Sequence, residues 1–96
     1  MKDKKNVYNI FKRFLQSKKI VEIITRKEII TTLPGSNITL DNYRNHFTLA
    51  GYLKWEKPGV YRKNNYIPNN LNSRDLRKKA YPHYKNWYEY THLNNT

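Results

Sequence analysis

A helix signal that passes without a linker into an extended segment constrains the fold of this chain most. The apolar residues of this helix recur at the spacing of a single helix face and are Leu40, Tyr43, Phe47 and Ala50. Thr39 is expected to cap the helix N-terminus, and Gly51 to end it in the left-handed conformation. Extended apolar character resumes at once in residues 52–55. The sequence therefore predicts a helix that leads directly into a strand.

The strand after Gly51 is expected to form half of a hairpin. Residues 56–59, Glu-Lys-Pro-Gly, are typical of a turn, and residues 60–62 begin a second strand. Pro68 closes this pattern. Trp55 and Tyr61 are expected to pack the hairpin against the helices.

An amphipathic helix is predicted near the N-terminus, from about Lys5 to Lys18. Its apolar face consists of Val7, Ile10, Phe11, Phe14 and Leu15. The β-branched stretch from Ile20 to Ile24 is too short for a helix, so we expect a brief strand there.

A second helix is predicted to begin at Thr25. Thr25 and Glu28 have the spacing of a capping box, in which each side chain satisfies a backbone N–H of the other. The helix is expected to end by Leu33, because Pro34 disfavours helical geometry in the residue before it. Residues 34–37 then form a turn.

Length and charge limit the class of protein. A chain of 96 residues supports one small domain, and 19 Lys and Arg against 7 Asp and Glu give a net charge of +12. This excess is typical of a protein with an anionic partner, nucleic acid above all. A solubilising surface or a coding bias toward Lys, Asn, Ile and Tyr is the alternative explanation.

Several other classes are not expected. Without cysteine there is no disulfide or thiolate metal site, and His46, His83 and His92 are too scattered for a zinc cluster, so no metal or cofactor is predicted. The apolar runs fall far short of the ~20 residues that cross a bilayer. The N-terminus also lacks a hydrophobic signal core. We expect a soluble intracellular protein, cytoplasmic or nucleoid-associated. Dispersed acidic residues and the lack of a glycine-rich phosphate loop argue against an enzyme.

The order of helix, short strand, capped short helix, turn, third helix and hairpin resembles the winged helix-turn-helix family. The match covers about Lys5 to Pro68, and its most telling segment runs from Thr39 to Leu53. The resemblance implies an α+β fold with three helices and a C-terminal hairpin wing over residues 1–68. Residues 69–96 are interpreted as a basic, aromatic extension.

The resemblance also implies that the third helix lies in the major groove of double-stranded DNA. Only there does each base pair present a distinct pattern of donors and acceptors. The residues expected to face the bases are Thr39, Asp41, Asn42, Arg44, Asn45 and Thr48. Asn45 and Asn42 suit adenine, and Asn45 is the leading candidate. The alternative is that these are solvated polar residues.

Two of these residues have other possible roles. Arg44 suits guanine or a phosphate, or instead lies over the core and reaches a phosphate with its charged end. Asp41 suits a cytosine amino group, or simply complements the helix dipole. Ser36, Asn37 and Thr39 are candidate phosphate contacts, because a helix N-terminus offers backbone N–H groups.

Cations on the hairpin and in the extension are further candidates. The wing contacts are expected to be Lys54, Lys57, Arg62 and Lys63, which suit a track of phosphates. The densest basic cluster, Arg74, Arg77, Lys78 and Lys79, either extends the DNA contact or is a solvated face. Ser73 is expected to cap this segment.

The aromatic tail from Tyr81 to Tyr90 has three possible roles. Tyr81, Tyr84 and Tyr88 share a helical face, which suits docking on the domain, pairing of two subunits or binding of another protein.

We expect a sequence-specific transcription regulator or replication factor of viral, phage or plasmid type. The alternative is a structural or protein-binding winged-helix component of a larger assembly, such as a virion or ribonucleoprotein. An inhibitor that blocks a nucleic-acid-binding partner is a third hypothesis, although the positive charge argues against mimicry of DNA.

Overall fold

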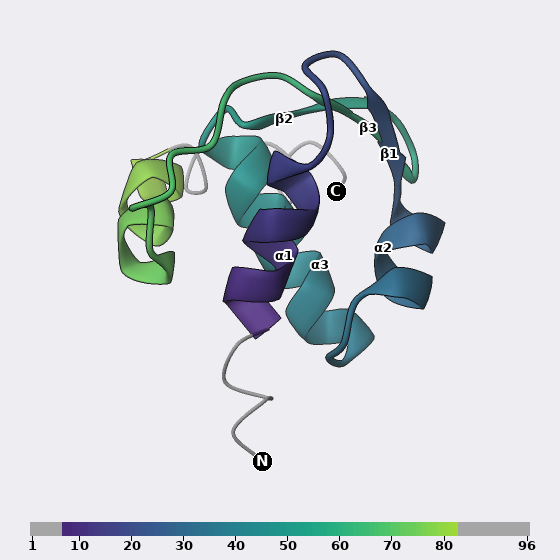
Figure 1. The fold of residues 1–96 in the computed structure, drawn as a ribbon, viewed down its shortest axis with the longest axis horizontal. Coiled ribbons are helices and arrows are strands. Elements are labelled where there is room, and N and C mark those ends of the chain that lie inside the picture. The colour runs from purple at the N-terminus through teal and green to yellow at the C-terminus, as the bar shows by residue number, and fades with distance from the viewer. Residues whose placement is uncertain (1–6, 83–96) are drawn as a thin grey trace, which may run out of the picture.

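The computed structural model describes residues 7–82. Its elements are α1 (Val7–Gln16), β1 (Ile23–Thr25), α2 (Arg26–Thr32), α3 (Asn37–Leu49), β2 (Leu53–Lys57) and β3 (Val60–Lys63). A further helix follows, of which residues 73–82 are described, and we call it the C-terminal helix. The predicted α+β class is confirmed. Figure 1 shows the sheet lying across the C-terminal ends of α1 and α3.

The first helix carries the centre of the hydrophobic core. Its buried residues are Val7, Phe11 and Leu15 of the predicted apolar face together with Tyr8, whereas Ile10 and Phe14 of that face are partly buried. Phe11 packs against Phe47 of α3, with 5.6 Å between ring centroids. The helix ends at Gln16, two residues before the predicted end, where the Lys18 N–H donates to the Leu15 carbonyl and tightens the last turn.

The three strands form an antiparallel sheet in the order β1-β3-β2. The predicted hairpin is confirmed, and Tyr61 of β3 lies between Ile24 of β1 and Trp55 of β2. The first strand begins three residues later than predicted. Ile20 and Val21 form a turn instead, in which the Val21 N–H donates to the Lys63 carbonyl at 2.7 Å.

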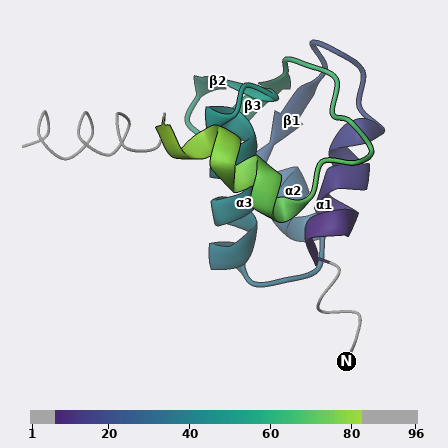
Figure 2. The ribbon, with the colours of Figure 1, turned by 90° about the vertical axis from the view of Figure 1, so that its left-hand side faces the viewer.

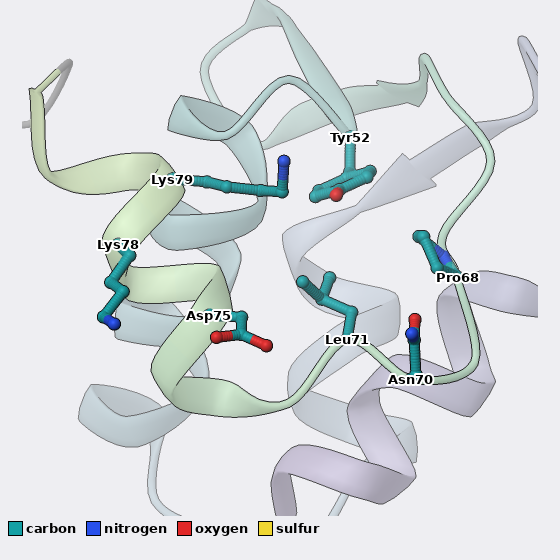
Figure 3. A pocket seen from close by; sticks show the side chains of 7 residues that line it. All are labelled: Tyr52, Pro68, Asn70, Leu71, Asp75, Lys78 and Lys79. Atoms are coloured by element: carbon teal, nitrogen blue, oxygen red, sulfur yellow. The ribbon is translucent and has the colours of Figure 1, made fainter.

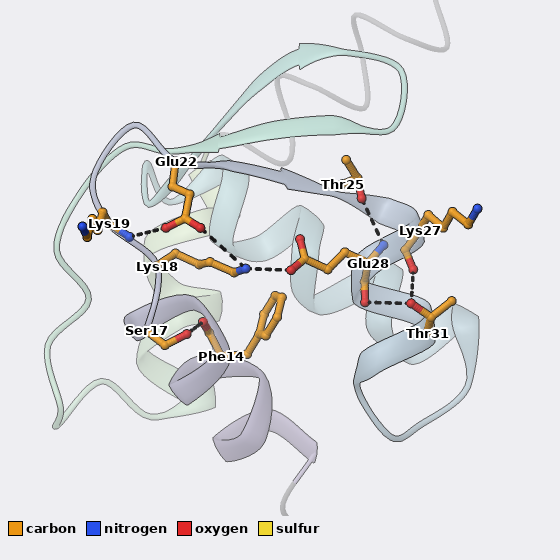
Figure 4. Close-up of polar contacts among 9 residues, drawn as sticks. All are labelled: Phe14, Ser17, Lys18, Lys19, Glu22, Thr25, Lys27, Glu28 and Thr31. Carbon is orange, nitrogen blue, oxygen red and sulfur yellow. Dashed lines mark hydrogen bonds and ion pairs between the residues drawn. The ribbon is translucent and has the colours of Figure 1, made fainter.

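The start of α2 follows the prediction only in part. Thr25 caps the helix, because its hydroxyl accepts from the Glu28 N–H at 3.0 Å. The Glu28 carboxylate does not complete a capping box with Thr25. It accepts from Lys18 Nζ at 2.6 Å and so ties α2 to the end of α1 (Figure 4). Leu33 ends the helix in extended geometry, as Pro34 requires.

The third helix begins earlier than predicted, with Ser36 and not Thr39 as its cap. The Ser36 hydroxyl accepts from the Thr39 N–H at 3.1 Å, which places Thr39 inside the first turn. Asn37 and Ile38 therefore belong to the helix. Gly51 ends it with φ +94°, as predicted, and the chain enters β2 two residues later.

Residues beyond Pro68 pack on the same core. Leu71 and Leu76 are buried, and the Tyr8 hydroxyl donates to the Leu71 carbonyl at 2.8 Å. The C-terminal helix is capped by Asn72 and not by Ser73, since Asn72 Oδ1 accepts from the Asp75 N–H at 2.8 Å. Figure 2 shows this helix crossing in front of α3. Tyr81 is exposed, and the rest of the aromatic tail lies outside the described residues.

Candidate nucleic-acid interface

One face of α3 points away from Leu40 and Phe47, the two residues that the helix buries in the core. Residues at a helical spacing of four and three share this face: Ile38, Asn42, Asn45 and Leu49. We call these four residues the reading face. Asn42 is exposed and Asn45 is half-buried. Ile38 is 75 % exposed.

Ile38 was missed at the sequence level. The helix was predicted to start at Thr39, which left Ile38 in the preceding turn. The signal that places it on the reading face is its spacing from Asn42 and Asn45 once Ser36 is taken as the cap. At this exposure the Ile38 side chain makes no contribution to the core.

Asp41 does not point toward a partner. Its carboxylate accepts from Arg26 Nε at 3.0 Å and from Arg26 Nη2 at 3.1 Å, which joins the start of α2 to α3. Arg44 Nη1 donates to the same carboxylate. The hydrogen bond from Arg26 is the main cause that holds the pKa of Asp41 below its ordinary range. The expected contact of Asp41 with cytosine is therefore replaced by an ion pair within the domain.

Arg44 lies between α3 and the sheet. Its side chain is 11 % exposed, and its guanidinium lies 5.1 Å from the centre of the Tyr61 ring. It donates to Asp41 and, at 3.1 Å, to Asn45 Oδ1, while its Nε is buried without a hydrogen-bond partner among the described residues. Of the roles expected for Arg44, covering the core fits this position, and direct contact with guanine does not.

The remaining residues of α3 divide into engaged and available groups. The Arg44 guanidinium orients the Asn45 amide, whose Oδ1 keeps a second lone pair as an acceptor. Thr48 is engaged, because its hydroxyl donates to the Arg44 carbonyl at 2.8 Å. Ser36 and Thr39 bond to each other at the helix start, whereas Asn37 is exposed.

The cations expected on the wing, which lie on the hairpin of β2 and β3, also divide. Lys54 and Lys57 on β2 are exposed. Arg62 is held on the sheet by Glu56 Oε2 at 3.1 Å and by the Val21 carbonyl at 2.8 Å. Trp55 is 54 % exposed and does not pin the wing to the helices as expected, whereas Tyr61 is buried.

Lys63 is a correction to the predicted wing contacts. It is 4 % exposed, and its Nζ donates to the Lys18 carbonyl at 2.7 Å, just beyond the end of α1. The reason is the alternation of side chains along β3, which turns Tyr61 and Lys63 to the same inward face. Burial lowers the pKa of Lys63. The spacing of two residues from Tyr61 was the available sequence signal.

The cations of the C-terminal helix do not all lie on one side of it. Arg74, Arg77, Lys78 and Lys79 are all exposed; Arg74, Arg77 and Lys78 have the i, i+3, i+4 spacing of one helix face, and Lys79 lies to the side of that face. Lys79 lines a hollow of about 380 Å³ with Tyr52, where Figure 3 shows it reaching toward the tyrosine ring while Lys78 turns away. Asp75 lines the same hollow, so its charge is mixed. Arg77 lines a different hollow, against α3.

Within residues 7–82, no three histidine or acidic side chains lie close enough to hold a metal ion. None of the helices in these residues is long and apolar enough to cross a membrane. In comparisons with known proteins, no protein-family model, no curated protein and no solved structure matches this chain.

Proposed function

We propose that this protein binds double-stranded DNA through a winged helix-turn-helix domain and recognises a specific site. In this proposal the reading face of α3 enters the major groove, and the hairpin contacts the sugar-phosphate backbone. A small transcription regulator or replication factor of viral, phage or plasmid type fits this activity. The observation that carries the proposal is the uncovered reading face, two asparagines and an exposed isoleucine on one side of a helix, beside a hairpin with exposed lysines.

The side chains of the reading face suit the chemistry of an A·T pair. The amide of asparagine pairs with adenine N6 and N7, and an apolar side chain packs against the thymine methyl group. Ile38, Asn42 and Asn45 offer both kinds of contact along one face. We therefore expect the preferred site to contain A·T pairs where α3 contacts the bases.

The distribution of charge supports a polyanionic partner. Ion pairs within residues 7–82 engage only some of the cations. The exposed cations that make no ion pair with the described residues are Arg13, Lys19, Lys27, Lys54, Lys57, Arg74, Arg77, Lys78 and Lys79. Lys54 and Lys57 are the members of this set on the wing. Such charges release counterions when they meet phosphates, which makes binding depend on salt.

The test is selection from a randomised duplex pool, followed by binding of the selected site across a salt series. Asn45→Ala is expected to relax the preference at one or two positions by about 5-fold to 150-fold. Asn9→Ala, at an exposed helical asparagine of α1 that lies outside the reading face, is the control and should leave the preference unchanged. Failure to enrich any site, with equal behaviour of both variants, would overturn specific recognition.

The wing has its own variant in the same experiment. Lys54→Ala with Lys57→Ala should weaken binding to all duplexes and reduce the salt slope by about 2, because each lost phosphate contact removes about one unit. Arg13→Ala with Lys19→Ala removes the same charge from the end of α1 and the following turn, and is the control. Equal slopes for the two double variants would refute a wing contact.

A second candidate function is a protein-binding component of a larger assembly. It is favoured by the exposed apolar side chains of Ile20, Val21 and Ile23 beside β1, which is an edge strand of the sheet. This function predicts weak, sequence-indifferent DNA binding and a stable complex with another protein. The duplex selection therefore separates the two candidates.

A further inference from the structure

A hollow of about 230 Å³ lies between α3 and the C-terminal helix. Its lining comes from both helices and consists of Thr39, Asn42, Tyr43, His46, Ser73 and Arg77. The ring of Tyr43 packs on Tyr8 and Phe11 of the core, with 5.5 and 6.1 Å between centroids, so this wall of the hollow is fixed. The hollow thus has a firm apolar wall and a polar lining.

The polar lining suits an anion. Arg77 contributes a guanidinium, Ser73 a hydroxyl and Asn42 an amide, and none of the lining residues is acidic. None of these three side chains makes a hydrogen bond or ion pair with another described residue. A group with several oxygen acceptors in a small volume would satisfy donors from both helices at once, as phosphate does.

His46 makes the hollow sensitive to the charge of its occupant. It is half-buried on α3, and burial first, then the positive charge of Arg77, lowers its pKa. Two other titratable groups line the hollow with His46: Tyr43, which also lies on α3, and Arg77 from the C-terminal helix. An anion placed between His46 and Arg77 would cancel their repulsion.

The position of the hollow relates it to the reading face. Asn42 belongs to the reading face and also lines the hollow, so the two surfaces adjoin along one flank of α3. When a helix lies in a major groove, the phosphates of the flanking strand run beside it. A phosphate beside a helix bound in this way would lie next to the flank of α3 that the hollow occupies.

We propose that the hollow between α3 and the C-terminal helix binds a backbone phosphate of the same duplex whose bases meet the reading face. Arg77 pairs with the phosphate, and Ser73 and Asn42 donate to its oxygens. This inference rests on the proposed function. It assigns phosphate binding in the hollow to Arg77, with His46 beside it, and not to the neighbouring cations Arg74, Lys78 and Lys79, which do not line the hollow. A phosphate contact fixes the register of the helix on the duplex and carries no sequence information.

Protonation of His46 is linked to this binding. A phosphate beside the imidazole favours its charged form and raises its pKa in the complex. Binding therefore takes up a proton, and the affinity is expected to increase as the pH falls toward the ordinary histidine value of 6.5.

The test compares Arg77→Gln with Arg74→Gln in the full chain, using the duplex selected above. Both changes remove one positive charge from the same helix, but Arg74 does not line the hollow. Arg77→Gln is expected to weaken binding to every duplex about tenfold or more and to lower the salt slope by about 1. Arg74→Gln should stay within about twofold of the native protein, since a solvated charge contributes little at physiological salt. Equal thermal melts of the variants would show that folding is unaffected.

The second readout is the pKa of His46, measured by following its imidazole NMR signals across a pH series in the native protein and in the complex. A rise on binding, abolished in Arg77→Gln, supports the phosphate site. Equal losses in the two arginine variants, with an unchanged pKa of His46 in a complex that still forms, would overturn the site and leave the proposed function standing. Absence of any duplex binding would overturn both.

Discussion

Asp41→Asn removes the carboxylate that joins α2 to α3 and neutralises Arg44. The Arg44 side chain is 11 % exposed and that of Asp41 is 30 % exposed, so this pair lies between the surface and the interior. Exposed pairs contribute less than about 1 kcal/mol, whereas leaving a buried charge without its partner costs about 3 to 5 kcal/mol. We expect Asp41→Asn to lower the free energy of unfolding by about 2 to 3 kcal/mol.

The measurement is urea unfolding at neutral pH with linear extrapolation. Arg26→Gln should cause a smaller loss, because it removes the more exposed partner and leaves Arg44 paired. Combining Asp41→Asn with Arg44→Leu should recover much of the stability, since no charge is then stranded. If Asp41→Asn and the native protein had the same urea midpoint of unfolding, the role assigned to this ion pair would be refuted.

The ion pair of Asp41 also makes the stability depend on pH. Because the folded protein holds the pKa of Asp41 below its ordinary value of 3.8, the stabilisation is present above that value and is lost as the pH falls through the lowered pKa. The difference in stability between the native protein and Asp41→Asn should therefore shrink in acid. A constant difference from neutral pH to acid would contradict this assignment.

Three further outcomes are expected. Ile38→Ala should reduce the preference for thymine at one position. Replacing that thymine by uracil removes only the methyl group, and should weaken duplex binding by the native protein but not by the variant. Equal losses of affinity in both proteins would refute the contact. Burial raises the pKa of Tyr8 from 10.0 to about 12. The neutral Tyr8 hydroxyl therefore contributes stability that is present below pH 10 and is lost as the pH rises toward 12. Alkaline unfolding of Tyr8→Phe should lack this dependence on pH. Lys63→Met should leave duplex affinity and its salt slope unchanged, because the ammonium is buried at the end of α1; a tenfold loss of affinity would show that Lys63 reaches a phosphate.

Spacing in the sequence was sufficient where structure depends on neighbours along the chain. The apolar periods of α1 and α3, the Thr25 cap, the Gly51 stop and the hairpin turn all reflect contacts within a few residues. They predicted the α+β class and the element that carries the reading face.

The start of α3 was misjudged because two hydroxyl side chains competed for one role. Ser36 and Thr39 both suit a helix N-cap, and the choice between them moves the helix start by three residues. The Ser36 cap brings Ile38 into the helix and onto the reading face. A local ambiguity thus concealed a candidate base contact.

The sequence by itself determined the order of the elements, the excess of positive charge and the polar character of α3. Only the tertiary structure decided which of those polar groups remain available to a partner. Asp41 is engaged by Arg26 from another helix, and Lys63 by a carbonyl beyond the end of α1. Arg77 is brought to the side of His46 in the same way. Charged groups pair with whatever the fold places within a few ångströms, and residues far apart in the chain acquire that proximity only when the core forms.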